Sequence, residues 1–175
     1  MYESMYHNTH EIADAIAAGL RTIGDVTVLP TALASQDDVT GCDLLVVGAP
    51  IHVHRLPTAR TRRAAIAARD RDGSTLQLDP HAADSSLREW LHALPRKAGL
   101  AAAFDTRMTG PATLTGRASR GIARQLRRHG ATIVDPPTSF LVDHSNHLVA
   151  GESDRAETWG RSLAARLGAS LTGDG

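Results

Sequence analysis

The amino-acid sequence predicts an α/β fold of three layers, in which helices cover both faces of a doubly wound parallel sheet. Short apolar segments with strand character alternate with helical patterns along the whole chain. Residues 44–47 form the continuous run Leu-Leu-Val-Val, which is typical of a strand buried on both faces. No internal repeat, low-complexity segment or interdomain linker breaks this alternation, so residues 1–175 are expected to form a single domain.

The first part of the chain predicts a helix, two strands and a basic helix. Asn8 is a candidate N-cap with Glu11 completing a capping box, and Gly24 is a candidate stop. Between them, apolar residues recur at helical spacing: Ile12, Ile16, Leu20 and Ile23. Residues 26–29 predict a strand closed by Pro30. The run at 44–47 predicts the next strand, and residues 58–69 a basic helix.

The second part continues the alternation. Residues 70–85 are rich in Asp, Gly and Ser and predict a loop, after which Ser86 is a candidate cap for an apolar helix face. Residues 100–104 predict a third apolar strand, followed by a Gly/Thr/Pro loop over 105–115. A helix stopped by Gly130 precedes two strand segments, 132–134 and 140–142, which are interrupted by Pro136-Pro137. Ser153 is a candidate cap for a C-terminal helix.

Composition and charge argue against several classes of protein. The 175 residues carry 19 basic and 19 acidic side chains and a net charge of zero, which argues against a nucleic-acid binder. No apolar run approaches the roughly 20 residues that span a membrane. The N-terminus lacks the pattern of a signal peptide. A single cysteine fits a reducing compartment. We therefore expect a cytoplasmic protein.

Three motifs follow one another in register: residues 4–9, Ser-Met-Tyr-His-Asn-Thr; residues 43–52, an apolar strand followed by a Gly-x-Pro turn; and residues 101–107, a small apolar strand followed by a polar loop. Together they resemble the flavodoxin-like family, particularly the small flavodoxin-type proteins of bacteria. In that resemblance, residues 4–9 are similar to the phosphate loop, residues 43–52 to the strand with its Gly-x-Pro turn, and residues 101–107 to the fourth strand with the flavin-contacting loop. The resemblance implies a sheet of order 2-1-3-4-5 with FMN at the carboxyl ends of the strands.

In that order the first strand is central, and here Met1 and Tyr2 alone stand for its last part. Removal of a central strand would expose unpaired backbone groups and apolar helix surface. We therefore expect the natural protein to start several residues earlier.

The resemblance assigns the first ligand loop to the phosphate. Ser4, Asn8 and Thr9 would contact it through side chains and amides, and Met5, Tyr6 and His7 through amides. The alternative is an ordinary strand-to-helix turn with a capping asparagine. His7 replaces the usual glycine of the family, so we expect strain if its φ is left-handed, and weakened FMN affinity.

The other two loops would contact the flavin ring. The second loop supplies Pro50, Ile51, His52, Val53 and His54, and stacking would rest on His52 or His54 because the family's tryptophan and tyrosine are missing here. The alternative for this His-x-His is a metal pair or a plain polar loop, and we expect no metal site. The third loop supplies Asp105, Thr106, Arg107 and Gly110 at the pyrimidine edge.

Within the third loop, the charge of Arg107 would favour reduced flavin, unless it is a surface arginine on a solvated loop. Asp105 at a strand end is more often a cap or turn former than a catalyst. No catalytic residue is assigned.

Two functions follow from this interpretation. The first is an FMN-binding redox protein, either an electron carrier that docks on a redox partner protein or an oxidoreductase that reduces quinone-type molecules with NAD(P)H. The net charge of zero gives no field to steer a partner protein, which argues against a dedicated ferredoxin-type carrier within the first function. The second is a binding or regulatory module that has kept the fold and lost FMN. The oligomeric state stays open, with a homodimer among the possibilities.

Overall fold

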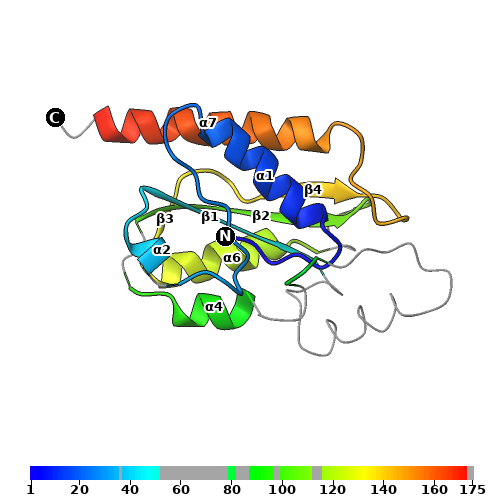
Figure 1. Ribbon diagram of the computed structural model, residues 1–175, viewed down its shortest axis with the longest axis horizontal. Helices are drawn as coiled ribbons and strands as arrows, with labels where there is room; N and C mark the ends of the chain where they lie inside the picture. The colour runs from blue at the N-terminus through cyan, green and yellow to red at the C-terminus, as the bar shows by residue number, and fades with distance from the viewer. Residues whose placement is uncertain (36, 52–78, 82–86, 97–98, 112–115, 173–175) are drawn as a thin grey trace.

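The computed structural model describes residues 1–35, 37–51, 79–81, 87–96, 99–111 and 116–172 (Figure 1). Its helices are α1 (Asn8–Leu20), α2 (Asp37–Thr40), α4 (Leu87–Ala93), α6 (Ala118–Arg128) and α7 (Glu152–Thr172). Its strands are β1 (Leu44–Pro50), β2 (Leu100–Met108), β3 (Thr132–Ile133) and β4 (Thr138–Val142). None of the helices in these ranges is long and apolar enough to cross a membrane.

The sheet is parallel and has the predicted order. β1 pairs with β2, and β2 pairs with β3 near its start and with β4 near its end. On the other side of β1, Tyr2 bridges Gly48 and Pro30, so the segment around Tyr2 lies between β1 and the segment that ends at Pro30. Counting the Pro30 segment as strand two and β3 with β4 as strand five, the order 2-1-3-4-5 is confirmed.

Two helical layers cover this sheet, with α1 and α7 on one face and α4 and α6 on the other (Figure 1). Alternate residues of β2 face the two layers, because side chains along a strand alternate in direction. Ala101 and Ala103 pack with α4 and α6, whereas Ala102 and Phe104 pack with α1 and α7. The three-layer, doubly wound fold predicted from the sequence is therefore confirmed.

Several predicted boundaries are wrong. α1 begins at Asn8 and ends at Leu20, so Asn8 is its first residue rather than its cap, and Ile23 is exposed beyond its end. Residues 26–29 form no regular strand, because the pairing of this segment is limited to contacts with Tyr2. β2 runs on to Met108, since β4 pairs with residues 104–108 that the sequence assigned partly to a loop. The predicted helix 58–69 lies outside the described residues.

A cavity of about 540 Å³ lies at the amino ends of the strands. Its walls come from the second half of α1, residues 23–28, residues 41–46 and Leu167. It is at the opposite end of β1 from the predicted ligand loops, so it does not belong to the candidate site.

Candidate functional site

The predicted ligand loops meet at the carboxyl ends of β1 and β2. The hydroxyl of Thr9, at the start of α1, lies 2.8 Å from the hydroxyl of Thr106 near the end of β2, and both residues are buried. The amide of Ile51, just after β1, donates to the carbonyl of Thr106 at 2.9 Å. Thr106 therefore joins the first and second loops to the third.

The loop before α1 makes its turn at His7, which has a left-handed backbone conformation with φ of 70°. His7 is the N-cap of α1, and its carbonyl accepts the first helical hydrogen bond from the amide of Glu11. The condition for strain set out from the sequence is therefore met, since left-handed backbone is costly for residues with a Cβ atom. The side chain of Asn8 donates to the carbonyl of Asn146 at 2.9 Å, which ties the loop to the turn after β4.

The hydroxyl of Ser4 fits an anion-binding role. It is buried and has no hydrogen-bond partner among the described residues, a condition that proteins rarely tolerate unless a ligand or water completes the site. Four residues later the chain enters α1, whose first N–H groups lack partners within the helix and carry its positive dipole end. An orphaned hydroxyl beside such amides is chemically suited to a phosphate group.

Thr9 adds a second hydroxyl at this point. Thr9 and Thr106 share one hydrogen bond, in which one hydroxyl donates and the other accepts. The hydroxyl that accepts keeps its own hydrogen, which can be donated to a ligand. Met5 contributes differently from its neighbours, because its side chain is fully buried and its carbonyl accepts a hydrogen bond from the amide of Asp79 at 2.9 Å. Tyr6 lies half-buried, and burial raises the pKa of its phenol.

Asp105 caps a helix. The sequence favoured this role, that of a cap or turn former, over catalysis. Its carboxylate is fully buried and accepts a hydrogen bond of 2.6 Å from the amide of Ser119 in the first turn of α6. Burial raises the pKa of Asp105, opposed by hydrogen bonds from Ser119 and Ser139 and by the charge of Arg107. One carboxylate oxygen of Asp105, Oδ2, is thus held by α6, whereas Oδ1 is buried without a hydrogen-bond partner among the described residues.

Arg107 lies at the end of β2 and turns back on the segment that follows. Its guanidinium donates to the carbonyl of Gly110 at 2.9 Å and to that of Met108 at 3.3 Å. Gly110 has φ of 125°, which favours glycine at this bend. The arginine therefore holds the shape of the third loop and keeps its positive charge at the carboxyl edge of the sheet. Contact between this charge and a flavin stays a prediction.

The second loop is described at its start. Pro50 ends β1 in register with Thr106, and both Pro50 and Ile51 are half-buried. His52, Val53 and His54 lie outside the described residues, so their predicted packing on a flavin and the metal alternative for the two histidines stay untested.

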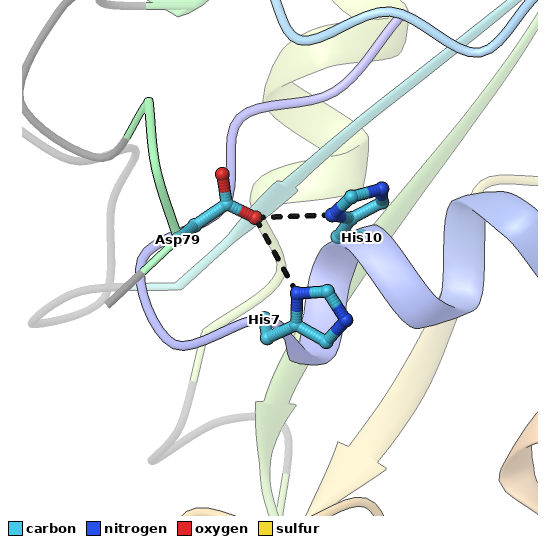
Figure 2. A group of neighbouring side chains, drawn as sticks. All are labelled: His7, His10 and Asp79. Atoms are coloured by element: carbon cyan, nitrogen blue, oxygen red, sulfur yellow. Dashed lines mark hydrogen bonds and ion pairs between the residues drawn. The ribbon is translucent and has the colours of Figure 1, made fainter. Parts of the chain in front are cut away.

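Asp79 and His10 are neighbours of the site that the sequence interpretation missed. The buried carboxylate of Asp79 faces the imidazoles of His7 and His10, directly beside the loop before α1 (Figure 2). The spacing His7-x-x-His10 was visible in the sequence and could have suggested paired side chains on the first turn of a helix. Asp79 is 69 residues from His10 and follows a polar stretch without helical or strand periodicity, so no sequence signal pointed to it.

Comparisons with known proteins bear on the fold that positions these loops. The family model described as flavodoxin domain matches residues 1–105. A flavodoxin from the domain Archaea superposes with a TM-score of 0.63 at 18% identity over 95% of each chain. Oxidised flavodoxin 1 from Bacillus cereus superposes with a TM-score of 0.61 at 16% identity over 95% of this chain and 92% of that one.

A larger protein contains the same fold as a part. Rubredoxin oxygen:oxidoreductase from Desulfovibrio gigas superposes with a TM-score of 0.62 at 17% identity, over 97% of this chain and 35% of that one. The comparison with curated proteins gave no match. At these identities the superpositions establish a shared fold.

Proposed function

The chain belongs to the flavodoxin domain family, and we propose that it is a redox protein that binds FMN at the carboxyl ends of β1 and β2. The observation that carries the proposal is the buried hydroxyl of Ser4, which lacks a partner among the described residues at the first position of the phosphate-loop motif. A phosphate oxygen would complete the hydrogen bonding of this hydroxyl.

The residues that would hold the phosphate are those of the loop before α1. Ser4 and Thr9 would each donate a hydroxyl, and the amides of Tyr6, His7 and Asn8 would donate from the backbone. No lysine or arginine occurs in residues 1–20, so backbone dipoles and hydroxyls would balance the phosphate charge.

The ring of the cofactor would lie against the second and third loops. Met108 is 39% exposed at the end of β2, which makes it the exposed large apolar side chain at this edge among the described residues. We infer that Met108 offers apolar surface to the flavin, while the guanidinium of Arg107 supplies positive charge through the loop that it organises.

When bound, FMN supplies one- or two-electron chemistry, and the chain supplies binding, orientation and electrostatics. Its 19 basic and 19 acidic side chains give no net field to steer a highly charged partner protein. This balance favours reduction of small molecules of quinone type over service as a dedicated carrier. Anaerobic titration with NADPH and NADH separates the two roles, because direct bleaching of the flavin requires a reductase.

Binding of FMN is tested on the purified chain by flavin absorbance and by calorimetric titration with FMN after flavin removal. We expect one FMN per chain and a roughly tenfold loss of affinity in Ser4→Ala, since one hydrogen bond to a charged group is removed. Ser162→Ala, on the exposed face of α7, is the matched control and should bind as the parent does. A colourless chain that neither binds added FMN nor quenches its fluorescence would contradict the proposal.

A further inference from the structure

Beside the loop before α1, three side chains from two separate segments point toward one another (Figure 2). His7 and His10 belong to the cap and first turn of α1, and Asp79 belongs to the segment at 79–81. One oxygen of Asp79, Oδ2, lies 3.2 Å from Nδ1 of His10 and 3.8 Å from Nδ1 of His7. The ligand atoms of the three residues all lie within 4.8 Å of one another.

We propose that His7, His10 and Asp79 bind a divalent transition-metal ion of the zinc class. In a tetrahedral zinc site with bonds of about 2.0–2.1 Å to nitrogen and oxygen, ligand atoms lie roughly 3.4 Å apart. The two histidine–aspartate distances, 3.2 and 3.8 Å, lie on either side of that separation. Imidazole nitrogen and carboxylate oxygen are both ordinary zinc ligands.

The burial of Asp79 supports a bound cation. The side chain of Asp79 is 1% exposed, and its ion-pair contacts within the described part of the chain are both to imidazoles. A buried carboxylate is stable when it is paired with positive charge or coordinates a metal. The side chain of His7 is 57% exposed, so an ion could enter from solvent and keep a water ligand on that side.

His10 is held as metal-ligating histidines usually are. Its second nitrogen, Nε2, lies 3.5 Å from the carboxylate of Asp14 one turn along α1. Nδ1 of His10 lies at hydrogen-bond distance, 3.2 Å, from Asp79. In the neutral tautomer with its N–H on Nε2, facing Asp14, the lone pair of Nδ1 would point toward Asp79, where a cation would satisfy both groups. The ring of Tyr2 stacks on that of His10 with centroids 4.6 Å apart, which fixes its plane.

The surroundings of His10 are negatively charged, because the carboxylates of Asp79 and Asp14 lie 3.2 Å and 3.5 Å from its two ring nitrogens. The backbone of His7 is left-handed at this point, and strained conformations of this kind tend to mark functional positions. An ion at this point would also fix segment 79–81 to the loop before α1, in addition to the hydrogen bond from Asp79 to Met5.

The test is calorimetric titration of the full chain with Zn²⁺ after treatment with chelator and removal of flavin. We expect one Zn²⁺ per chain, a Zn²⁺-dependent rise in Tm, and visible absorption of a four- or five-coordinate ion when Co²⁺ replaces Zn²⁺. His10→Gln and Asp79→Asn should each weaken binding at least tenfold and remove the rise in Tm. Asp14→Ala, which removes the carboxylate that faces Nε2, should weaken binding about tenfold.

Two control variants replace histidines that lie outside the proposed metal site. His147 lies 4.0 Å from Asp143 in an exposed turn, and His147→Gln should bind Zn²⁺ as the parent does. The double variant His52→Gln/His54→Gln should also retain binding. No Zn²⁺ binding by the parent, or parent affinity in folded His10→Gln or Asp79→Asn, would overturn the proposal, as would loss of binding in the double variant alone. Far-UV circular dichroism reports folding, and because flavin-free chain is used, the result is separate from that of FMN binding.

Discussion

The hydroxyls of Thr9 and Thr106 lie 2.8 Å apart in the interior, joining the first turn of α1 to the end of β2. The two residues are 97 positions apart in sequence and lie on different layers of the fold. A parallel sheet makes this meeting possible, because the carboxyl ends of its strands and the amino ends of the following helices share one edge. The contact sets the position of the loop before α1 relative to the third loop.

Thr9→Val is expected to weaken both folding and FMN binding. The variant keeps the shape of the side chain and removes its hydroxyl, so the buried hydroxyl of Thr106 loses its partner. We expect a loss of about 1–3 kcal/mol in the free energy of unfolding, measured by urea denaturation. FMN affinity should fall roughly tenfold.

Thr22→Val is the control for this change, because the Thr22 hydroxyl bonds to Gly19 at the far end of α1. Its FMN affinity should equal that of the parent. In a double-mutant cycle, Thr9→Val and Thr106→Val should be strongly non-additive. Additive losses would show that the two hydroxyls do not act together.

His7→Gly is expected to stabilise the loop before α1. Glycine adopts φ of 70° without the penalty that a Cβ atom brings, although it also raises the entropy of the unfolded chain. We expect a net gain of up to about 1 kcal/mol in the free energy of unfolding, together with tighter FMN binding. Binding of Zn²⁺ should be lost in the same variant.

Asn146→Gly is the matched comparison, since Asn146 has φ of 63° and asparagine tolerates this region more readily. Its gain in stability should be smaller than that of His7→Gly. Equal or larger gains at Asn146 would contradict the strain assigned to His7. Both variants are measured by urea denaturation without added metal or flavin.

Asp105 should make stability depend on pH in an unusual direction. Burial raises the folded-state pKa of Asp105 above its ordinary value of 3.8, so the folded chain binds this proton more tightly than the unfolded chain. The contribution of Asp105 to stability is therefore fully present below pH 3.8 and is lost as the pH rises through the folded-state pKa. Asp105→Asn keeps an acceptor for the Ser119 amide and should be more stable than the parent at neutral pH.

That advantage should shrink as the pH falls toward 3.8, the ordinary value of the group. Asp105→Ala leaves the Ser119 amide without its acceptor and should be less stable than Asp105→Asn by about 1–3 kcal/mol at every pH. Asp37→Asn, at an exposed position of α2, should leave the pH profile unchanged. Urea denaturation at a series of pH values from about 3.5 to about 7, across which carboxylates titrate, measures these differences. An advantage of Asp105→Asn that grows on acidification would contradict the assignment.

The layers of the fold could be predicted because they depend on local patterns. The buried run at 44–47 and the helical spacing of Ile12 and Ile16 each report burial directly from the sequence. The family resemblance then supplied the order of the strands. Boundaries failed where distant partners decide them, as in β2, whose last four residues pair with β4 and, at Asp105 and Thr106, also with β1.

The candidate site was predictable in part for the same reason. Ser4 and Thr9 belong to a contiguous motif that reads as a phosphate loop. The contacts that organise this motif come from residues distant in the sequence. Thr106 hydrogen-bonds to Thr9, and the carbonyl of Asn146 accepts from Asn8. Asp79 faces His7. Such contacts depend on how the loops of the sheet edge fold over one another, which no local periodicity records.

Arg107→Gln is expected to make bound FMN harder to reduce. Removing a positive charge near the carboxyl edge disfavours the added negative charge of reduced flavin, and glutamine can still donate to the carbonyl of Gly110. The reduction potential should fall by on the order of tens of millivolts, measured by anaerobic redox titration. Arg161→Gln on α7 is the control and should leave the potential unchanged. An unchanged potential in Arg107→Gln would place Arg107 as a structural residue of the loop.

Gly160 and Gly19 should be required for the contact between α7 and α1. A Cβ atom built on Gly160 would lie 2.3 Å from the carbonyl oxygen of Ile16, and one on Gly19 would lie 2.2 Å from that of Glu157. Both obstacles are backbone atoms, which cannot move aside without separating the helices. Gly160→Ala should therefore lose more than about 3 kcal/mol in the free energy of unfolding, at or above the upper end for overpacked sites.

Gly168 lies two turns further along α7, and a Cβ atom there would meet nothing within 4 Å. Gly168→Ala should thus gain about 0.5–1 kcal/mol, because alanine loses less backbone entropy than glycine on entering a helix. The two variants add the same methyl group to the same helix, so intrinsic helix propensity cancels between them. A difference of opposite sign in their urea midpoints, at constant m value, would isolate the close approach of the two backbones. Equal stability of the two variants would show that α1 and α7 can separate without loss.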